Sequence, residues 1–248
     1  MAVLPNQPAL QPEKDAMGKA IQDYFKTGNK DIEVTVYSDF SDPDVIPAEL
    51  LFRMDDDLPE LEQVAIEHCE GEVLDIGAGS GSHALMLQKA GFDVTAMDVS
   101  PLSIEVMQQR GVKNTLQENI FYYKEKQYDT LLMLMNGIGL VGTLDGLKHF
   151  LEHVKTLLKP GGQLIFDSSD IIYLYQDDDG SYLIDIAGEY YGQLEYWMEY
   201  GEAKGDKFGW LYVSFPVMEE YANEAGFNAE VLYTGDHHDY LARLTLQS

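Results

Sequence analysis

The chain has 248 residues, enough for one large domain or one domain with a small cap, and 45% of them are hydrophobic, enough for a substantial core. Its 43 acidic and 16 basic residues give a formal net charge of −27. Nucleic acids are bound largely through lysine and arginine contacts to phosphate, so this charge argues against a nucleic-acid partner and, for the same reason, against anionic membrane surfaces. A neutral or cationic substrate fits this charge, as does a surface that is acidic only for solubility.

The sequence gives few signs of secretion or of a membrane. Residues 1–10 lack a basic region followed by a long apolar run, and no stretch approaches the ~20 apolar residues of a membrane span. Cys69 is the single cysteine, so no disulfide forms within the chain. We therefore expect a cytoplasmic protein with no membrane partner.

Residues 1–69 precede the regular part of the pattern and contain short elements. Proline near the first turn marks the start of two of the helices, and Gly28 follows the end of another. The predicted elements are a loose tail over 1–12, an amphipathic helix over 17–25, a short strand over 32–37, and helices over 47–53 and 58–69. We expect residues 1–69 to form a tail and a helical cap over the edge of the main domain, residues 70–248.

A glycine-rich loop lies between two buried strands. The strand predicted over 72–77 leads into the loop, and the strand predicted over 93–98 ends at Asp98. Glycines at alternate positions let the backbone approach a ligand and expose amide donors, and an acid about 20 residues later suits hydrogen bonds to ribose hydroxyls. The loop consists of Gly77, Ala78, Gly79, Ser80 and Gly81.

Two cofactor types use this geometry, dinucleotides and S-adenosylmethionine, and the details favour the second. The spacing is G-x-G-x-G, and Ser82 stands where a dinucleotide fingerprint has its third glycine. Asp75, two residues before the first glycine, can hold the ammonium of a methionine moiety, and a dinucleotide has no cation to meet such an acid. An ordinary glycine turn of an α/β protein remains the third interpretation.

The rest of the main domain alternates strands and helices, as a parallel sheet requires. Residues 118–128 are too few and too polar for a full crossover helix. The further predicted elements are strands over 113–117, 129–135 and 162–167, helices over 145–158 and 216–226, and a closing antiparallel pair over 229–233 and 240–246.

Residues 171–215 form an insertion that this pattern does not need. Apolar and aromatic residues alternate on both sides of a turn with two glycines, which predicts a β-hairpin over 194–212. The hairpin could line a substrate pocket, pack on the sheet edge, or contact a second subunit.

Four ordered motifs between residues 70 and 170 resemble those of the class I S-adenosylmethionine-dependent methyltransferases. They are the glycine loop, Asp98-Val99-Ser100-Pro101, Tyr128-Asp129-Thr130 opening an apolar strand, and Leu157-Leu158-Lys159-Pro160-Gly161-Gly162 before the fifth strand. The resemblance implies an α/β, Rossmann-like seven-stranded mostly parallel sheet with helices on both faces. To this fold we add the N-terminal helical cap and the β-hairpin insertion after strand five.

The resemblance also implies where the cofactor S-adenosylmethionine lies. Its methionine half would contact Asp75, the glycine loop, Met135 and Asn136; its ribose would contact Asp98; and its adenine would contact Val99, Asn119 and Ile120. Many relatives carry an aspartate where Asn119 falls, and an amide oxygen can accept the same hydrogen bond.

Residues for proton transfer are harder to find. The turn Asp236-His237-His238-Asp239 is expected at the carboxyl edge of the sheet, which makes His237 and His238 weak candidates for a proton acceptor, although a solvated turn is the favoured interpretation. His149 and His153 match the H-x-x-E-H zinc pattern, but both fall off the apolar face of their helix, so no metal site is expected. Further candidates are Asp167, Asp170, Tyr173 and Tyr190.

The sequence therefore predicts a methyltransferase acting on a small molecule, as a monomer or a homodimer. A protein methyltransferase recruiting a basic peptide, and a non-catalytic S-adenosylmethionine-binding protein, are the alternatives. The acceptor atom is not assigned.

Overall fold

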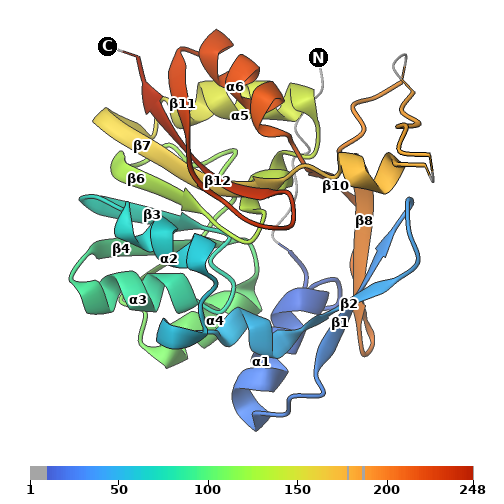
Figure 1. Ribbon diagram of the computed structural model, residues 1–248. Coiled ribbons are helices and arrows are strands. Elements are labelled where there is room, and N and C mark those ends of the chain that lie inside the picture. The colour runs from blue at the N-terminus through green and yellow to red at the C-terminus, as the bar shows by residue number, and fades with distance from the viewer. Residues whose placement is uncertain (1–9, 178, 186–187, 248) are drawn as a thin grey trace.

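The computed structural model describes residues 10–177, 179–185 and 188–247. A seven-stranded sheet forms the centre of the molecule, with the strand order β11-β12-β7-β6-β3-β4-β5 (Figure 1). The pairs among β3 to β7 are parallel, whereas β12 runs antiparallel to both β7 and β11. The strands are β3 (Glu72–Ile76), β4 (Asp93–Asp98), β5 (Asn114–Gln117), β6 (Tyr128–Met133), β7 (Leu158–Ser169), β11 (Phe227–Thr234) and β12 (Asp239–Leu246). The predicted mostly parallel sheet and its antiparallel end are confirmed.

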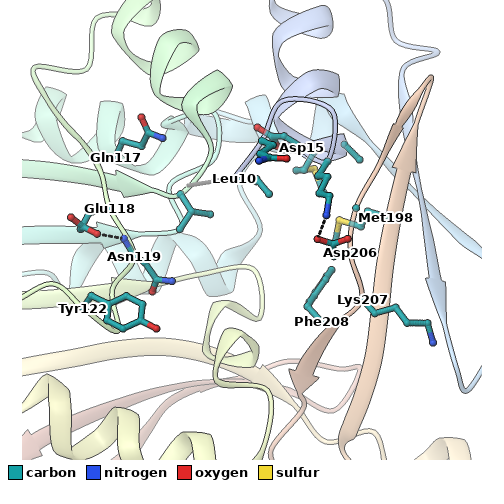
Figure 2. Close-up of a pocket in the computed structure, with 16 residues that line it drawn as sticks. Leu10, Asp15, Gln117, Glu118, Asn119, Tyr122, Met198, Asp206, Lys207 and Phe208 are labelled. Carbon is teal, nitrogen blue, oxygen red and sulfur yellow. Dashed lines mark hydrogen bonds and ion pairs between the residues drawn. The ribbon is translucent and has the colours of Figure 1, made fainter. Parts of the chain in front are cut away.

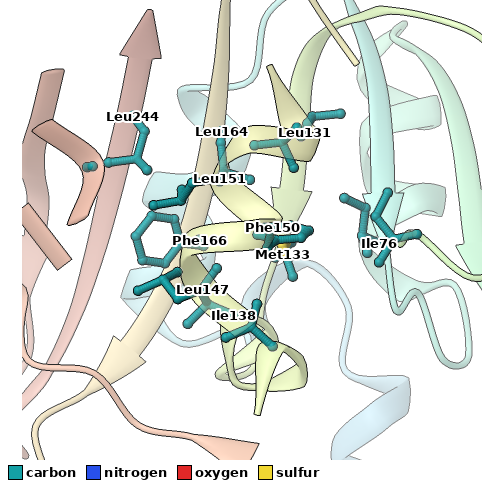
Figure 3. Packing of buried hydrophobic residues seen from close by; sticks show 14 of the residues in the cluster. Ile76, Leu131, Met133, Ile138, Leu147, Phe150, Leu151, Leu164, Phe166 and Leu244 are labelled. Carbon is teal, nitrogen blue, oxygen red and sulfur yellow. The ribbon is translucent and has the colours of Figure 1, made fainter. Parts of the chain in front are cut away.

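Helices cover both faces of this sheet. On one face lie α2 (Glu60–Glu67), α3 (Ser82–Ala90) and α4 (Pro101–Arg110), and on the other α5 (Leu144–Val154) and α6 (Phe215–Glu224) (Figure 1). Alternation along the central strands produces the two layers: Leu131, Met133 and Phe166 belong to the cluster with α5 and α6 (Figure 3), whereas Leu132 and Ile165 pack with α2 and α3. Between β5 and β6 there are turns and no helix, as predicted from the short and polar sequence of residues 118–128.

A second sheet stands beside the core. Its strand order is β10-β8-β1-β2, with β9 paired to β8 (Figure 1). The strands are β1 (Glu33–Ser38), β2 (Asp44–Pro47), β8 (Gln193–Tyr200), β9 (Ala203–Lys204) and β10 (Phe208–Leu211). β8 and β10 form the predicted hairpin, and β8 also pairs antiparallel with β1, so that Val36 lies opposite Met198. The N-terminal segment and the insertion thus share one sheet.

This sheet corrects one detail of the expected fold, because the N-terminal cap is not purely helical. Residues predicted as a helix over 47–53 form the end of β2 and the 3-10 helix η1 (Ala48–Phe52). An isolated two-stranded hairpin is marginally stable in water, and β1 and β2 complete the sheet that the insertion begins. The helix predicted over 58–69 is present as α2, after a short 3-10 helix η2 (Asp55–Asp57).

Helix α1 (Ala16–Thr27) connects the two sheets, since it packs against α4 of the core and against β8. It ends at Gly28, which has a left-handed φ of 64°, as the sequence predicted. At its other end Asp15 accepts a 2.8 Å hydrogen bond from the Gly18 amide and one from the Ser100 hydroxyl at the start of α4. Two more 3-10 helices, η3 (Gly137–Val141) and η4 (Ile172–Tyr175), follow β6 and β7. Within the described ranges, no helix has the length and apolar character to cross a membrane.

Candidate functional site

The glycine loop after β3 is held by the neighbouring strand. Gly77, Gly79 and Gly81 have φ values of 74°, 55° and 82°, a region that side chains with a Cβ rarely adopt. The amides of Gly77 and Ala78 both donate to the Met97 carbonyl, at 2.9 and 3.0 Å. The loop is therefore a fixed surface of backbone at the carboxyl end of β3, where the strand order reverses between β4 and β6.

Asp98, at the end of β4, is bonded to this loop. Its Oδ2 accepts a 2.8 Å hydrogen bond from the Gly79 amide, and its Oδ1 accepts one of the same length from the Ser100 amide. Burial raises the pKa of Asp98 to about 6, although these two hydrogen bonds act in the opposite direction. The nearby carboxylates of Asp15 and Asp75 raise it as well.

The side chains of Ser80 and Ile120 make contacts within the protein and line neither of the two clefts described below. The Ser80 hydroxyl donates to the Leu51 carbonyl, and Arg110 donates to the Ser80 carbonyl and hydroxyl, so this side chain connects η1 to α4. Ile120 is buried in the core, and its carbonyl accepts from Nε2 of His153. A cofactor contact of Ser80 would have to use its backbone.

A cleft of about 510 Å³ opens beside β4 and β5 (Figure 2). Two predicted residues line it, Val99, which is 42% exposed, and Asn119, whose Oδ1 accepts a 3.0 Å hydrogen bond from the Phe121 amide. The opposite walls come from the N-terminal segment, which was expected to cap this edge, and from the second sheet, whose hairpin was one of the segments expected to line a pocket. They include Leu10, Asp15, Met17, Met198 and Phe208.

A smaller cleft of about 290 Å³ lies on the other side of the loop, between β6, β7 and the start of α2. Met135 and Asn136 line it as predicted, and both have positive φ, 63° and 56°. Such strain in residues other than glycine gathers at functional sites. The other lining residues are Arg53, Pro59, Leu61, Glu62, Asp167 and Asp239.

Two buried polar atoms in this smaller cleft have no hydrogen-bond partner within the described part of the chain. They are Nε of Arg53 and Oδ1 of Asp167. Arg53 uses Nη2 to donate to Glu62 at 2.6 Å, and Oδ2 of Asp167 accepts from the Asn136 amide at 2.8 Å. Burial raises the pKa of Asp167 to about 7. An unpaired donor and an unpaired acceptor in one cleft match a ligand carrying both an anionic and a cationic group.

Asp75 lies beneath the loop and lines neither cleft. It is 2% exposed, its Oδ2 has no partner among the described residues, and burial raises its pKa to about 6. Nearby His83 forms a 2.7 Å hydrogen bond with Glu62. Burial alone would lower the pKa of His83, but Glu62 and the charges of Asp75 and Asp167 outweigh it, so the pKa is raised. The predicted contact between Asp75 and a methionine ammonium stays a prediction.

A solved structure decides the family. The crystal structure of a S-adenosylmethionine-dependent methyltransferase from Bacteroides fragilis, in complex with S-adenosylhomocysteine, is 45% identical, with a TM-score of 0.91 over 98% of this chain and 99% of that one. This chain belongs to the S-adenosylmethionine-dependent methyltransferases. The methyltransferase domain family also matches residues 74–166, from β3 to β7.

Two further similarities to this methyltransferase cover a smaller part of the chain. The demethylmenaquinone methyltransferase of Tropheryma whipplei is 28% identical over 99 residues, 38% of this chain and 40% of that protein. The chain thus spans less than half the length of that curated relative. A S-adenosylmethionine-dependent methyltransferase structure from Clostridium acetobutylicum is 16% identical, with a TM-score of 0.55 over 76% of this chain and 91% of that one, and shows the shared fold alone.

The histidines that the sequence singled out lie in two places, the turn before β12 and helix α5. The turn before β12 lies at the carboxyl edge, because Asp239 pairs with Ser169 at the end of β7. His238 stacks on Tyr173 with ring centroids 5.0 Å apart, while the exposed His237 lines neither cleft. Their proposed role as proton acceptors stays a prediction. His149 bonds its own helix through the Asp145 carbonyl, and the described residues contain no group of three or more side chains suited to a metal.

Proposed function

We propose that this protein transfers the methyl group of S-adenosylmethionine to a small molecule in the cytoplasm, as a monomer or homodimer. The observation that carries the proposal is the arrangement at the carboxyl edge: a fixed glycine loop, bonded to Asp98, with one cleft on each side. An extended cofactor with a nucleoside at one end and an amino acid at the other fits such a site.

The adenosine end belongs in the larger cleft. Val99 offers an exposed apolar surface for the adenine ring, and Asn119 lies at the end of β5 beside it. Asp98 is bonded to the loop and directly precedes Val99, which lines this cleft, so its carboxylate can accept hydrogen bonds from the ribose hydroxyls. Met17 and Met198 cover the same space from the N-terminal segment and the second sheet.

The amino-acid end belongs in the smaller cleft. The free Nε of Arg53 suits the carboxylate of the methionine moiety, and the free Oδ1 of Asp167 suits its ammonium. Asp167 differs here from Asp75, because Asp167 lines the cleft and Asp75 does not. Pairing with an ammonium lowers the pKa of a buried carboxyl, so bound cofactor relieves the cost of burying this charge.

The sulfonium then lies above the loop near Met135 and Asn136. The acceptor atom attacks the methyl carbon in line, its lone pair forms the new bond, and the electrons of the breaking carbon–sulfur bond go to sulfur. The protein contributes orientation and the exclusion of water, which supply much of the rate of such a reaction. The net charge of −27 disfavours nucleic acid as the acceptor, which favours a small molecule.

Calorimetry tests the cofactor, and S-adenosylhomocysteine release tests the reaction. We expect micromolar binding of S-adenosylhomocysteine and far weaker binding of NAD. Incubation with S-adenosylmethionine and a fractionated small-molecule extract should release S-adenosylhomocysteine in defined fractions. Tighter binding of NAD would reject the cofactor assignment, and cofactor binding with turnover only on peptides would reject the small-molecule acceptor.

A further inference from the structure

Three tyrosine side chains from separate segments come together beyond the end of β7. Tyr173 lies in η4, Tyr196 in β8, and Tyr212 just after β10. The hydroxyl of Tyr196 donates to that of Tyr212 at 3.5 Å, and their ring centroids are 6.5 Å apart. Tyr173 stacks on His238 of the neighbouring turn, and its phenol contributes to the raised pKa values of Tyr196 and Tyr212. We call Tyr173, Tyr196 and Tyr212 the tyrosine cluster.

The tyrosine cluster continues the wall of the larger cleft. Tyr196 is two residues from Met198 on β8, so both side chains point to the same face of the second sheet, and Tyr196 packs against Phe208 with centroids 6.4 Å apart. Met198 and Phe208 line the larger cleft (Figure 2). The wall therefore runs from the adenosine end near β5 towards the end of β7.

Close backbone packing brings this sheet over the strands where the sulfonium is proposed to lie. A Cβ on Gly139 in η3 would stand 2.2 Å from Nε1 of Trp210, so β10 passes directly over the turn that follows Asn136. The amide of Val213 donates to the Ser168 hydroxyl near the end of β7. The tyrosine cluster thus lies over the β6–β7 half of the carboxyl edge, opposite the adenosine end.

Asp170 fixes the segments around the tyrosine cluster. Its Oδ1 accepts a 2.7 Å hydrogen bond from the Tyr191 hydroxyl and a 3.0 Å bond from the Ile172 amide at the start of η4. Its own amide donates to the His238 carbonyl at 2.9 Å. One residue therefore holds η4 and the histidine turn together.

We infer that the methyl acceptor is an amine and that the ring faces of the tyrosine cluster receive its positive charge. This inference rests on the proposed methyl transfer. Aromatic rings attract cations through their negative faces. Burial raises the pKa values of Tyr196 and Tyr212, so both rings are neutral phenols. The charged groups acting on Tyr196 and Tyr191, Asp39 and Asp170, are both acids. A phenolate or enolate acceptor would be repelled by them.

Methyl transfer to an amine can be followed proton by proton and electron pair by electron pair. An acceptor that enters as an ammonium first gives one proton to His238, whose exposed imidazole stacks on Tyr173, and His238 passes it to solvent. The nitrogen lone pair then forms the bond to the methyl carbon, the carbon–sulfur bond breaks, and its electrons return to sulfur. Positive charge leaves sulfur and appears on nitrogen, in front of the rings.

A matched pair of probes tests the charge preference. Choline and its neutral isostere 3,3-dimethylbutan-1-ol are titrated by NMR into the protein loaded with S-adenosylhomocysteine. Choline should bind about tenfold or more tightly than the alcohol. Tyr196→Leu should remove most of this preference, whereas Tyr196→Phe, which keeps the ring, should retain it. Equal binding of the two probes overturns the inference.

Tyr37→Leu is the matched control. Tyr37 stacks on Trp197, with centroids 5.1 Å apart, on the face of the same sheet opposite Tyr196, so the preference should be unchanged. If Tyr37→Leu also loses the preference for choline, the loss in Tyr196→Leu reflects general damage to the second sheet. That result would overturn the inference. Failure to bind S-adenosylhomocysteine at all would instead reject the proposed function. Turnover on hydroxyl acceptors with none on amines would leave the methyl transfer standing and reject the amine.

Discussion

The core sheet and the second sheet build their parts of the site in different ways. The core supplies the glycine loop, Asp98, Val99 and Asn136 from one continuous stretch, in the order of the strands. The second sheet joins residues 33–47 to residues 193–211, and a hydrogen bond from the Glu195 amide to Asp39 spans 156 residues of sequence. The glycine loop and its neighbours are therefore local in sequence, with Arg53 and Asp167 added from either side of that stretch, and the half assigned to the acceptor depends on distant pairing.

The two regions also use different chemistry. The core offers backbone amides and carboxylates in fixed positions, which serve any reaction of the same cofactor. The second sheet offers aromatic side chains from β8 and β10, which come from a segment outside the glycine loop and the strands around it. Damage to the core should therefore remove cofactor binding, and damage to the second sheet should remove acceptor turnover.

The largest effect is expected from Gly81→Val in the core. A Cβ at this position would stand 2.8 Å from Cγ of Met107 and 2.9 Å from Cγ2 of Val112, at a φ of 82°. Strain and overpacking together should cost about 2–6 kcal/mol, so calorimetry should detect no S-adenosylhomocysteine binding. Gly91→Asn is the control, since a Cβ at Gly91 meets nothing within 4 Å and asparagine tolerates its left-handed φ. Wild-type affinity in Gly81→Val would contradict a fixed loop.

The second-largest effect is expected from a substitution in the second sheet, which should lower acceptor turnover more than cofactor affinity. Val36→Pro places proline in β1, which pairs on both sides, with β2 and with β8. Proline in a central strand removes a ladder hydrogen bond, so acceptor turnover should fall more than about tenfold. Affinity for S-adenosylhomocysteine should fall much less, because most cofactor contacts belong to the core. Equal losses in both measurements would show that the second sheet is part of the cofactor site.

A smaller effect is expected on the affinity for S-adenosylhomocysteine when Asp167→Asn is compared with Asp75→Asn. If Asp167 binds the methionine ammonium, its amide variant should bind S-adenosylhomocysteine with about 1–3 kcal/mol less free energy, and Asp75→Asn should lose less. Calorimetry on both variants decides between the two carboxylates. The reverse order would restore the assignment of the ammonium to Asp75.

Asp167→Asn should also stabilise the ligand-free protein. The folded-state pKa of Asp167, about 7, lies above its ordinary value of 3.8, so its stabilising contribution is present below pH 4 and is lost as the pH rises towards 7. The variant should therefore melt roughly 2–8 °C higher at pH 7.5, for a gain of about 1–2 kcal/mol, and this advantage should shrink towards pH 5. A lower melting temperature at pH 7.5 would contradict a buried charge without a partner.

The smallest expected effect is the pH dependence of cofactor binding. Asp98 has a pKa of about 6, and its ionised form is the better acceptor for ribose hydroxyls. Affinity for S-adenosylhomocysteine should fall several-fold as the pH is lowered from 7.5 to 5.5, and binding near pH 6 should release protons. Calorimetry in buffers of different ionisation enthalpy measures this release. Asp98→Asn should bind more weakly and show a flatter profile, and an unchanged profile would remove Asp98 from the ribose site.

The sequence predicted the core because its signals are local. Glycine spacing, the acid at the end of β4 and the alternation of strands and helices each depend on neighbouring residues, and the structure has all of them. Arg53 carries no such signal, because it lies in a short connection after a 3-10 helix and is recognisable only by its unpaired Nε. The sequence offered Asp167 only as one of several candidates for proton transfer. The unpaired Oδ1 that distinguishes it from those candidates is visible only in the structure.

The second sheet was predicted in pieces. The short strand near residue 33 and the hairpin over 194–212 were both recognised, but nothing in either segment specifies the other as its partner. Where Val36 pairs with Met198, α1 packs on β1 and β8 through one small apolar cluster, and α1 also contacts α4 of the core. Convergence of the tyrosine cluster follows from that pairing and could not be predicted without it.

The pairing of β1 with β8 also affects how the protein is made. A ribosome adds about 5–20 residues per second, so the 156 residues between Asp39 and Glu195 take roughly 8–30 s to synthesise. During that interval β1 and β2 have no β8 to pair with, and an unpaired strand edge is a template for aggregation. The glycine loop and most core strands emerge within the same interval. A nascent chain would therefore form much of its cofactor site before β8, the partner of β1, has been synthesised. This makes β1 and β2 the expected place for a chaperone to bind.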